Sequence, residues 1–213
     1  RFHDWVDQAY DGWPGYAFEA ADAAYLARLD PVNELDPNDR DYCALAVDWV
    51  EAQVVEAESA IAADERPPVA YDSYLDVGQR IRDLALAYDW CAGLLTTPQR
   101  DRWRAYAEQA VWNVWNPDDA EWGGNPFPWT GWSLTNPGNN YHYSFLEATM
   151  AWGLARESSC AGCTDWVAFL EAEKVAPLVA YYASLPGGGS REGTGYGTAQ
   201  KNLFEIYRLW RDA

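Results

Sequence analysis

An apolar stripe along residues 74–95 constrains the fold more strongly than any other feature of the sequence. Its members recur every three or four residues: Val77, Ile81, Leu84, Tyr88, Cys91 and Leu95. Because an α-helix turns once every 3.6 residues, this spacing brings them to one face, which must be buried against another part of the chain. The stretch is therefore predicted to be an amphipathic helix.

Similar spacing recurs along most of the chain, and no stretch alternates in the manner of a half-buried strand. A long helix is predicted to start at Asp36-Pro37, a capping residue followed by proline, and to stop at Pro67-Pro68. Further helices are expected at about 18–29, 97–116, 140–156, 164–184 and 198–210. Pro177 should kink or break the helix in which it lies. Successive helices joined by turns give antiparallel hairpins, so we predict an all-α fold that forms an incomplete α/α toroid.

The size and composition of the chain favour one compact unit. It has 213 residues, of which 49% are hydrophobic and 15% aromatic, enough for a substantial core. We therefore expect residues 1–213 to form a single helical domain. Since the chain begins with Arg1 rather than methionine, we expect it to be processed or to be a piece of a longer protein.

The chain is strongly acidic, with 15 basic and 33 acidic residues and a net charge of −18. This charge would repel nucleic acids and anionic membranes. No apolar run approaches the ~20 residues that a membrane-spanning helix needs. We therefore expect neither a nucleic acid nor a membrane as partner, and an acidic ligand would need a locally basic or amide-lined groove.

The four cysteines do not indicate a disulfide-rich scaffold in a chain of this length. Cys160 and Cys163 form a lone C-x-x-C motif, which favours a local disulfide or two free thiols. A zinc site would need further ligands that are not nearby. Cys43 and Cys91 lie on apolar helix faces and are expected to be core residues. Neither a metal nor a cofactor is predicted.

Residues 116–139 form a long predicted loop that is rich in proline, glycine and tryptophan. Structureless loops longer than ~12–15 residues are usually functional or disordered. Trp122, Trp129 and Trp132 argue against disorder and could stack on sugar rings, although tryptophans near loops are often packing residues. A second glycine-rich loop spans residues 185–197. Both loops follow an odd number of long helices counted from the start of the chain. Both loops should therefore emerge on one face.

The first loop ends in a group of polar and aromatic side chains: Asn139, Asn140, Tyr141, His142 and Tyr143. The amide of Asn140, at a helix N-terminus, could bind the carboxylate of a uronic-acid sugar as it gains negative charge during β-elimination. A tyrosine or histidine must then move the proton. An Asn pair in this position could equally be a helix cap.

The second loop carries Arg191, Glu192 and Tyr196. Tyrosine has a pKa near 10, so its use as a base at pH 7 requires a shift of about three units, roughly 4 kcal/mol. Arg191 or His142 could supply part of it as a nearby cation, whereas action as an acid needs no shift. Glu147 and Glu192 could instead be the acid and base of a glycoside hydrolase.

Three segments of the chain carry motifs of a known family. Leu84-Ala-Leu-Ala-Tyr-Asp-Trp90 followed by Leu95-Thr-Thr-Pro-Gln-Arg100 resembles the helix-turn-helix segment of heparinase II/III-like proteins and the related alginate and chondroitin lyases. Asn139-Asn140-Tyr141-His142-Tyr143 is similar to their Asn-Asn-His motif. Gly189-Ser-Arg-Glu-Gly-Thr-Gly-Tyr-Gly197 is similar to their segment with the catalytic tyrosine, and the spacing of the last two motifs is also similar.

This resemblance implies a metal-independent polysaccharide lyase that acts on a uronic-acid-containing polysaccharide. Asn140 would neutralise the uronate carboxylate, and Tyr196 would act as acid and could also act as base. The motif departs at Tyr141, where the family usually has histidine, and His142 comes one position later, about 100° round a helix. The family's fold is longer, so the chain would be the N-terminal part of a longer lyase.

The remaining residues of the two loops that we expect to bind substrate are Trp129, Trp132, Asn139, Tyr141, Tyr143, Arg191 and Glu192. A periplasmic or extracellular location is expected. Two alternatives stay open: a glycoside hydrolase on an α/α barrel, and a carbohydrate-binding domain without catalysis.

Overall fold

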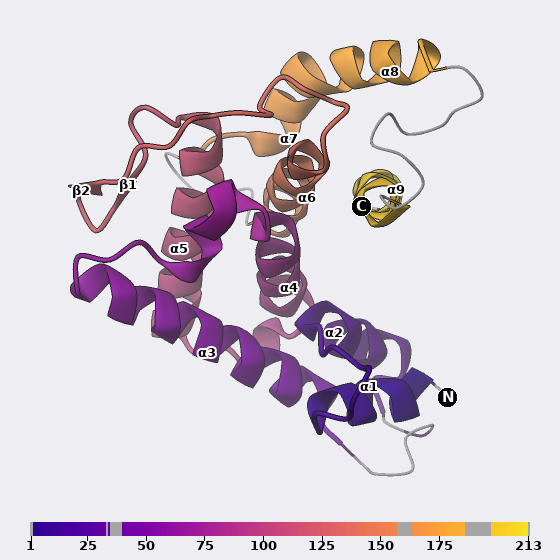
Figure 1. The fold of residues 1–213 in the computed structure, drawn as a ribbon. Coiled ribbons are helices and arrows are strands. Elements are labelled where there is room, and N and C mark those ends of the chain that lie inside the picture. The colour runs from indigo at the N-terminus through magenta and orange to yellow at the C-terminus, as the bar shows by residue number, and fades with distance from the viewer. Residues whose placement is uncertain (1, 33, 35–39, 157–162, 186–196, 213) are drawn as a thin grey trace.

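The computed structural model describes residues 2–32, 34, 40–156, 163–185 and 197–212. With 70% helix and 2% strand, it confirms the prediction of an all-α chain. The described helices are α1 (Phe2–Tyr10), α2 (Ala20–Leu29), α3 (Tyr42–Ala62), α4 (Val77–Trp90), α5 (Thr97–Trp115), α6 (Asn140–Ala155), α7 (Trp166–Leu170), α8 (Ala176–Ala183) and α9 (Gly197–Asp212) (Figure 1). The shorter elements are the 3₁₀ segments η1 (Pro68–Tyr74) and η2 (Ala92–Leu94), the π-helical turn η3 (Glu171–Val175), and the strands β1 (Glu121–Trp122) and β2 (Asn125–Pro126).

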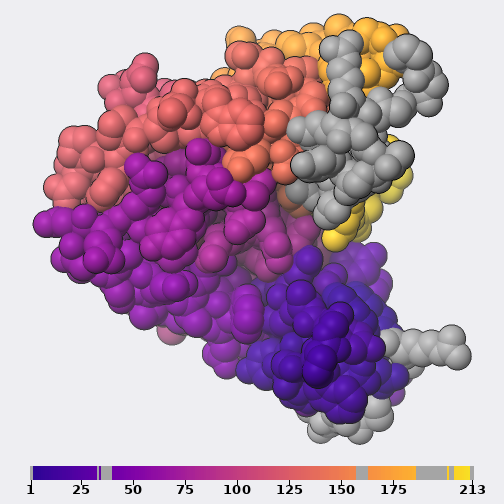
Figure 2. All heavy atoms as spheres, in the orientation of Figure 1, coloured from indigo at the N-terminus to yellow at the C-terminus, as the bar shows by residue number. Residues whose placement is uncertain are grey.

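Helices α4 and α6 form the centre of the fold. They pack against each other along much of their length, α2, α3 and α5 pack on α4, and α7 and α9 pack on α6 (Figure 1). In the space-filling view, α3 and the N-terminal helices lie side by side (Figure 2). The predicted stripe of α4 is buried, and residues such as Ile81 and Leu84 are inaccessible to solvent. No described helix is both long enough and apolar enough to cross a bilayer.

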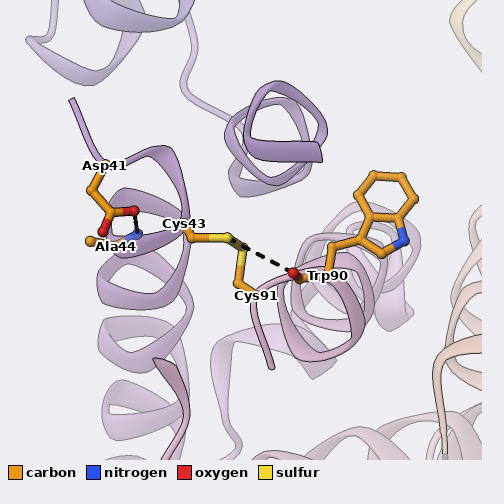
Figure 3. Close-up of a disulfide and its surroundings, with 5 residues drawn as sticks. All are labelled: Asp41, Cys43, Ala44, Trp90 and Cys91. Carbon is orange, nitrogen blue, oxygen red and sulfur yellow. Dashed lines mark hydrogen bonds between the residues drawn. A yellow bond between two sulfur atoms is a disulfide. The ribbon is translucent and has the colours of Figure 1, made fainter. Parts of the chain in front are cut away.

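Several helix ends differ from the predicted ones. Helix α3 begins at Tyr42, and the carboxylate of Asp41 accepts a hydrogen bond from the Ala44 N–H (Figure 3). The predicted start at Asp36-Pro37 is therefore wrong, and those two residues lie outside the described ones. Helix α5 begins as expected near Thr97-Pro98, with Thr96 as the capping residue.

The helix predicted to kink or break at Pro177 contains a π-helical turn instead of a break. The residues at the junctions of α7, η3 and α8 keep right-handed helical dihedrals, η3 ends at Val175, and Pro177 lies in the first turn of α8. Proline has no N–H to donate, and its ring crowds the carbonyl one turn earlier. The wider π turn accommodates both effects.

Helix α1 and the hairpin of β1 and β2 are among the elements that were not predicted. Both are short, and each strand of the hairpin has two residues, with Glu121 paired to Pro126. Periodicity needs a longer window than either of them provides. The hairpin lies within the loop 116–139, which is therefore partly ordered by backbone pairing.

A disulfide joins Cys43 in α3 to Cys91 just after α4 (Figure 3). The prediction that they are core residues is confirmed for Cys91, which is buried, and Cys43 is partly buried against the same core, but the bond between them was not predicted. Sequence spacing did not predict this bond because the two cysteines are 48 residues apart, and no local spacing indicates such a pair. Cys163 is also disulfide-bonded, and Cys160 lies outside the described residues.

Removal of the Cys43–Cys91 bond should destabilise the protein. A crosslink that closes a loop of 48 residues restricts the unfolded chain, which corresponds to about 4 kcal/mol in the loop-entropy treatment. We expect Cys43→Ser/Cys91→Ser to lower the free energy of unfolding by about 2–4 kcal/mol in urea titrations. Ala44→Ser is the control and should change it by less than about 0.5 kcal/mol. Equal effects would contradict the prediction.

Helices α4 and α6 approach each other closely at Gly78. Its N–H donates a hydrogen bond of 2.8 Å to Ser144 Oγ. A Cβ atom at Gly78 would lie 2.6 Å from Glu147 Oε2 and 2.8 Å from the Ser144 carbonyl oxygen. Only glycine therefore fits here without moving α6.

Gly78→Ala should destabilise the protein by about 1–3 kcal/mol because the added methyl group overpacks the contact between α4 and α6. Gly93 in η2 provides a control, since nothing lies within 4 Å of a Cβ atom there. Gly93→Ala should stay within about 0.5 kcal/mol of the parent protein. Thermal and urea unfolding measure both. A stable Gly78→Ala variant would show that α6 can shift freely.

Candidate functional site

The two asparagines at the start of α6 have different roles. Asn139 is the capping residue, and its side-chain oxygen accepts a hydrogen bond of 3.0 Å from the Tyr141 N–H. Asn140 is the first residue of the helix and is half-buried. Within the described part of the chain, its amide has no hydrogen-bond partner. Asn140 can therefore bind a ligand without breaking the cap.

An aromatic pair lies on one side of this helix start. Trp132 is 44% exposed, and its ring centroid is 4.6 Å from that of Tyr141. The Tyr141 hydroxyl donates a hydrogen bond of 2.9 Å to Asp72 Oδ1. Asp72 was not predicted as part of a site, because nothing in the sequence indicates a contact between η1 and α6.

The backbone around Asp72 is strained. Asp72, Ser73 and Tyr74 have φ values of 44°, 54° and 65°. Residues other than glycine rarely adopt such positive values. The buried ring of Tyr74 lies 5.4 Å from that of Trp129. Such strain persists only where the surrounding structure enforces it. Here the packing of Tyr74 and the Tyr141–Asp72 hydrogen bond hold the segment.

The other loop tryptophans lie beneath the surface. Trp129 is 9% exposed, and its indole N–H donates to the Asn113 carbonyl at 3.0 Å. Trp122 is also buried and donates to the Tyr74 hydroxyl at 3.3 Å. Both therefore fasten the loop to the core, which leaves Trp132 as the exposed indole of the three.

His142 is a buried residue in this structure. It is 4% exposed, and its Nδ1 donates a hydrogen bond of 2.9 Å to the Ser133 carbonyl. Burial lowers the pKa of His142 to about 4, the bond to Ser133 opposes this shift, and Lys174 adds to it. His142 is therefore neutral at pH 7 and holds the loop at Ser133. It projects about 200° round the helix from Asn140.

A group of tyrosines lies on another side of the α6 start. The hydroxyls of Tyr143 and Tyr182 are 2.9 Å apart, and the Tyr143 hydroxyl also donates to the Pro137 carbonyl. A Cβ atom at Gly138 would lie 3.0 Å from the hydroxyl of Tyr181. Burial raises the pKa of Tyr182, which the hydrogen bond with Tyr143 partly offsets. The end of α8 is thus fixed against the turn that precedes α6.

The three predicted residues of the second loop, Arg191, Glu192 and Tyr196, lie outside the described residues. The elements on either side of that loop are described. Tyr182 in α8 contacts α6, and α9, which begins at Gly197, packs along α6.

Lys174 is a nearby cation that sequence reasoning missed. Its ammonium nitrogen lies 4.3 Å from the centre of the Trp115 ring, which is nearly perpendicular to the His142 ring at a centroid distance of 6.4 Å. Burial lowers the pKa of Lys174, and Glu173 opposes the shift. It belongs to the π-helical turn η3, and such turns are frequent at functional sites. No sequence pattern marked it, because the π turn forms only through the effect of Pro177 on the helix.

Glu147 is fully buried in α6 and forms an ion pair of 2.9 Å with Arg82. Burial raises the pKa of Glu147 to about 7, against the opposing effect of Arg82. A role for Glu147 as acid or base of a glycoside hydrolase would require access that this structure does not offer.

Comparison of the chain with protein-family models, with curated proteins and with solved structures gives no match. Function is therefore argued from the residues and their geometry.

The two asparagines should differ in their effect on stability. Asn139→Ala removes the helix cap and should lower the free energy of unfolding by about 1 kcal/mol. Asn140→Ala removes no intramolecular hydrogen bond and should change it by less than about 0.5 kcal/mol. Urea titrations of this matched pair test the assignment. A larger loss for Asn140→Ala would identify Asn140 as the structural residue.

Proposed function

We propose that the chain is a polysaccharide lyase that cleaves an acidic, uronic-acid-containing polysaccharide by β-elimination. The main supporting observation is the half-buried amide of Asn140 in the first turn of α6, which has no hydrogen-bond partner among the described residues. The Trp132–Tyr141 pair and the Tyr143–Tyr182 pair flank this turn. Together they offer a carboxylate-binding group, an aromatic surface and phenol hydroxyls.

The start of α6 suits an anionic group despite the acidic character of the chain. The helix runs for 16 residues and has no acidic residue in its first turn. Its N-terminus carries a partial positive charge, although Asn139 already accepts hydrogen bonds from the N–H groups of Tyr141 and His142. The Asn140 amide can donate a hydrogen bond to a uronate carboxylate. This amide and the helix dipole would stabilise the enolate-like charge that develops when the C5 proton leaves.

The elimination requires two proton transfers, one from C5 of the sugar and one to the departing glycosidic oxygen. A base removes the proton at C5, the electron pair forms the C4–C5 double bond, and the C4–O bond breaks. An acid then protonates the departing glycosidic oxygen. We assign this acid to Tyr196, which can also serve as the base with Arg191 as the neighbouring cation. His142 is neutral and buried, so we assign it to positioning the loop.

The anchoring of the second loop supports this assignment. The last turn of α8 contacts the start of α6 through Tyr182, and α9 packs along α6. The residues on both sides of the loop that carries Tyr196 are thus held on the helix that carries Asn140. Trp132 and Tyr141 would contact the sugar rings, since aromatic faces pack well on the C–H groups of a pyranose.

Two wider features belong to the same proposal. The antiparallel helical hairpins would form an incomplete α/α toroid, in which α4 and α6 are central. A periplasmic or extracellular location agrees with the Cys43–Cys91 disulfide, because such bonds persist mainly in oxidising compartments.

Activity on uronate polymers tests the reaction type. The protein should be incubated with alginate, chondroitin, heparin and glucuronan. Elimination leaves an unsaturated uronate that absorbs near the ultraviolet edge, so absorbance should rise with the reducing ends. Reducing ends without this absorbance would indicate a hydrolase. Binding without any product would indicate a carbohydrate-binding domain.

Substitutions in the two loops should separate chemistry from folding. Tyr196→Phe should lower turnover about a hundred-fold or more, because one acid–base group contributes ~10²–10⁴. Asn140→Ala should also lower turnover while the protein still melts cooperatively. Thr135→Ala, at an exposed position of the first loop, is the control and should retain the parent rate. Full activity of Tyr196→Phe would remove Tyr196 from the mechanism.

A further inference from the structure

A second candidate site lies on the opposite side of α4 from α6. A pocket of about 540 Å³ opens between α3, the start of α4 and the segment before α2. This volume falls within the usual ~300–1,000 Å³ range of small-molecule sites. The residues that carry the argument are Phe18, Trp49, Glu56, Asp76, Gln79 and Arg80.

One wall of the pocket is aromatic. Trp49 is 44% exposed, although it lies on a helix whose other large apolar residues are mostly buried. Its ring meets the buried ring of Phe18 edge-on, with centroids 5.0 Å apart. Phe18 thus fixes the orientation of the indole while one side of it faces solvent. An exposed, positioned indole can pack against the flat apolar side of a ring.

The other walls carry polar side chains that are not paired with one another. Glu56 comes from α3, Asp76 and Gln79 come from the start of α4, and Arg80 follows Gln79. Within the described residues, none of these four side chains forms a hydrogen bond or an ion pair. Their donors and acceptors are therefore available to a ligand.

This combination fits a neutral sugar. A pyranose ring has an apolar C–H face, which suits Trp49, and hydroxyl groups that donate and accept hydrogen bonds. Each hydroxyl could accept from Arg80 or Gln79 and donate to Glu56 or Asp76. A uronate fits less well, since two open carboxylates face a single guanidinium on a chain of net charge −18.

We propose that this pocket is a binding site for a neutral sugar residue, separate from the site at the start of α6. The two sites lie on different faces of α4, because Gly78 contacts α6 whereas Asp76, Gln79 and Arg80 line the pocket toward α3. The inference goes beyond the proposed lyase activity and does not depend on it. A neutral sugar could belong to a mixed polysaccharide or to a separate glycan.

Calorimetric titration of the whole chain with cellohexaose, xylohexaose and mannohexaose tests the proposal. At least one of these neutral hexasaccharides should bind, and Trp49→Ala should weaken that binding about tenfold or more, equivalent to ~1.4 kcal/mol. Trp13→Ala is the matched control, because Trp13 is 55% exposed but does not line the pocket. It should leave the affinity unchanged.

Two further variants keep the test decisive. Gln79 is exposed on α4, so Gln79→Ala should fold normally and also weaken binding if Trp49→Ala proves unstable. Trp132→Ala alters the start of α6 and should leave neutral-sugar affinity unchanged, which separates this site from the lyase proposal. The absence of neutral-sugar binding, binding of uronate hexasaccharides alone, or unchanged affinity in both pocket variants would overturn the inference.

Discussion

The buried guanidinium of Arg82 fixes the arrangement of three helices. Its Nη1 donates a hydrogen bond of 2.9 Å to Glu147 in α6, and its Nη2 contacts both Glu19, just before α2, and the adjacent Asp83. Asp83 in turn accepts hydrogen bonds from the first N–H groups of α2. Because an unpaired buried charge costs several kcal/mol, each of these partners requires the others. The position of α6, and with it the exposed turn at Asn140, follows from this network.

Some carboxylates of the chain belong to this network, whereas others are open to solvent and could contact a ligand. Burial would lower the pKa of Arg82, but the carboxylates around it raise the pKa above that of a free guanidinium. Asp83 and the Oε1 atom of Glu147 are therefore paired within the protein. Glu56 and Asp76, which have no side-chain partner among the described residues, are exposed in the pocket whose lining includes the buried Asp83. Charge alone would not have distinguished the two groups, whereas burial does.

The tryptophans show a similar division. Several indole N–H groups bind carboxylates inside the fold: Trp103 donates to Glu51, and both Trp152 and Trp166 donate to Glu108. An indole that is buried needs such an acceptor. The high tryptophan content of this chain is therefore largely structural. Among the exposed indoles, Trp49 lies beside the unpaired polar side chains of the pocket, and Trp132 packs against the ring of Tyr141.

The sequence by itself determined the all-α class, the stripe of α4, the start of α5 near Thr97-Pro98 and an irregularity in the helix near Pro177. These features depend on residues within one or two helical turns, so local spacing and the missing N–H of proline suffice to predict them. The sequence also pointed to Asn139-Asn140 as the end of the first loop, but it left open whether this pair caps the helix or binds a ligand.

Only the tertiary structure decided which asparagine caps α6, and that His142 is buried while Trp132 is exposed. It also decided the Cys43–Cys91 bond and the Tyr141–Asp72 contact, which join residues 48 and 69 positions apart. Such pairs depend on how whole helices pack, and local periodicity carries no information about the partner that a helix face will meet. The physical reason is that helix formation is local, whereas burial and pairing are properties of the assembled fold.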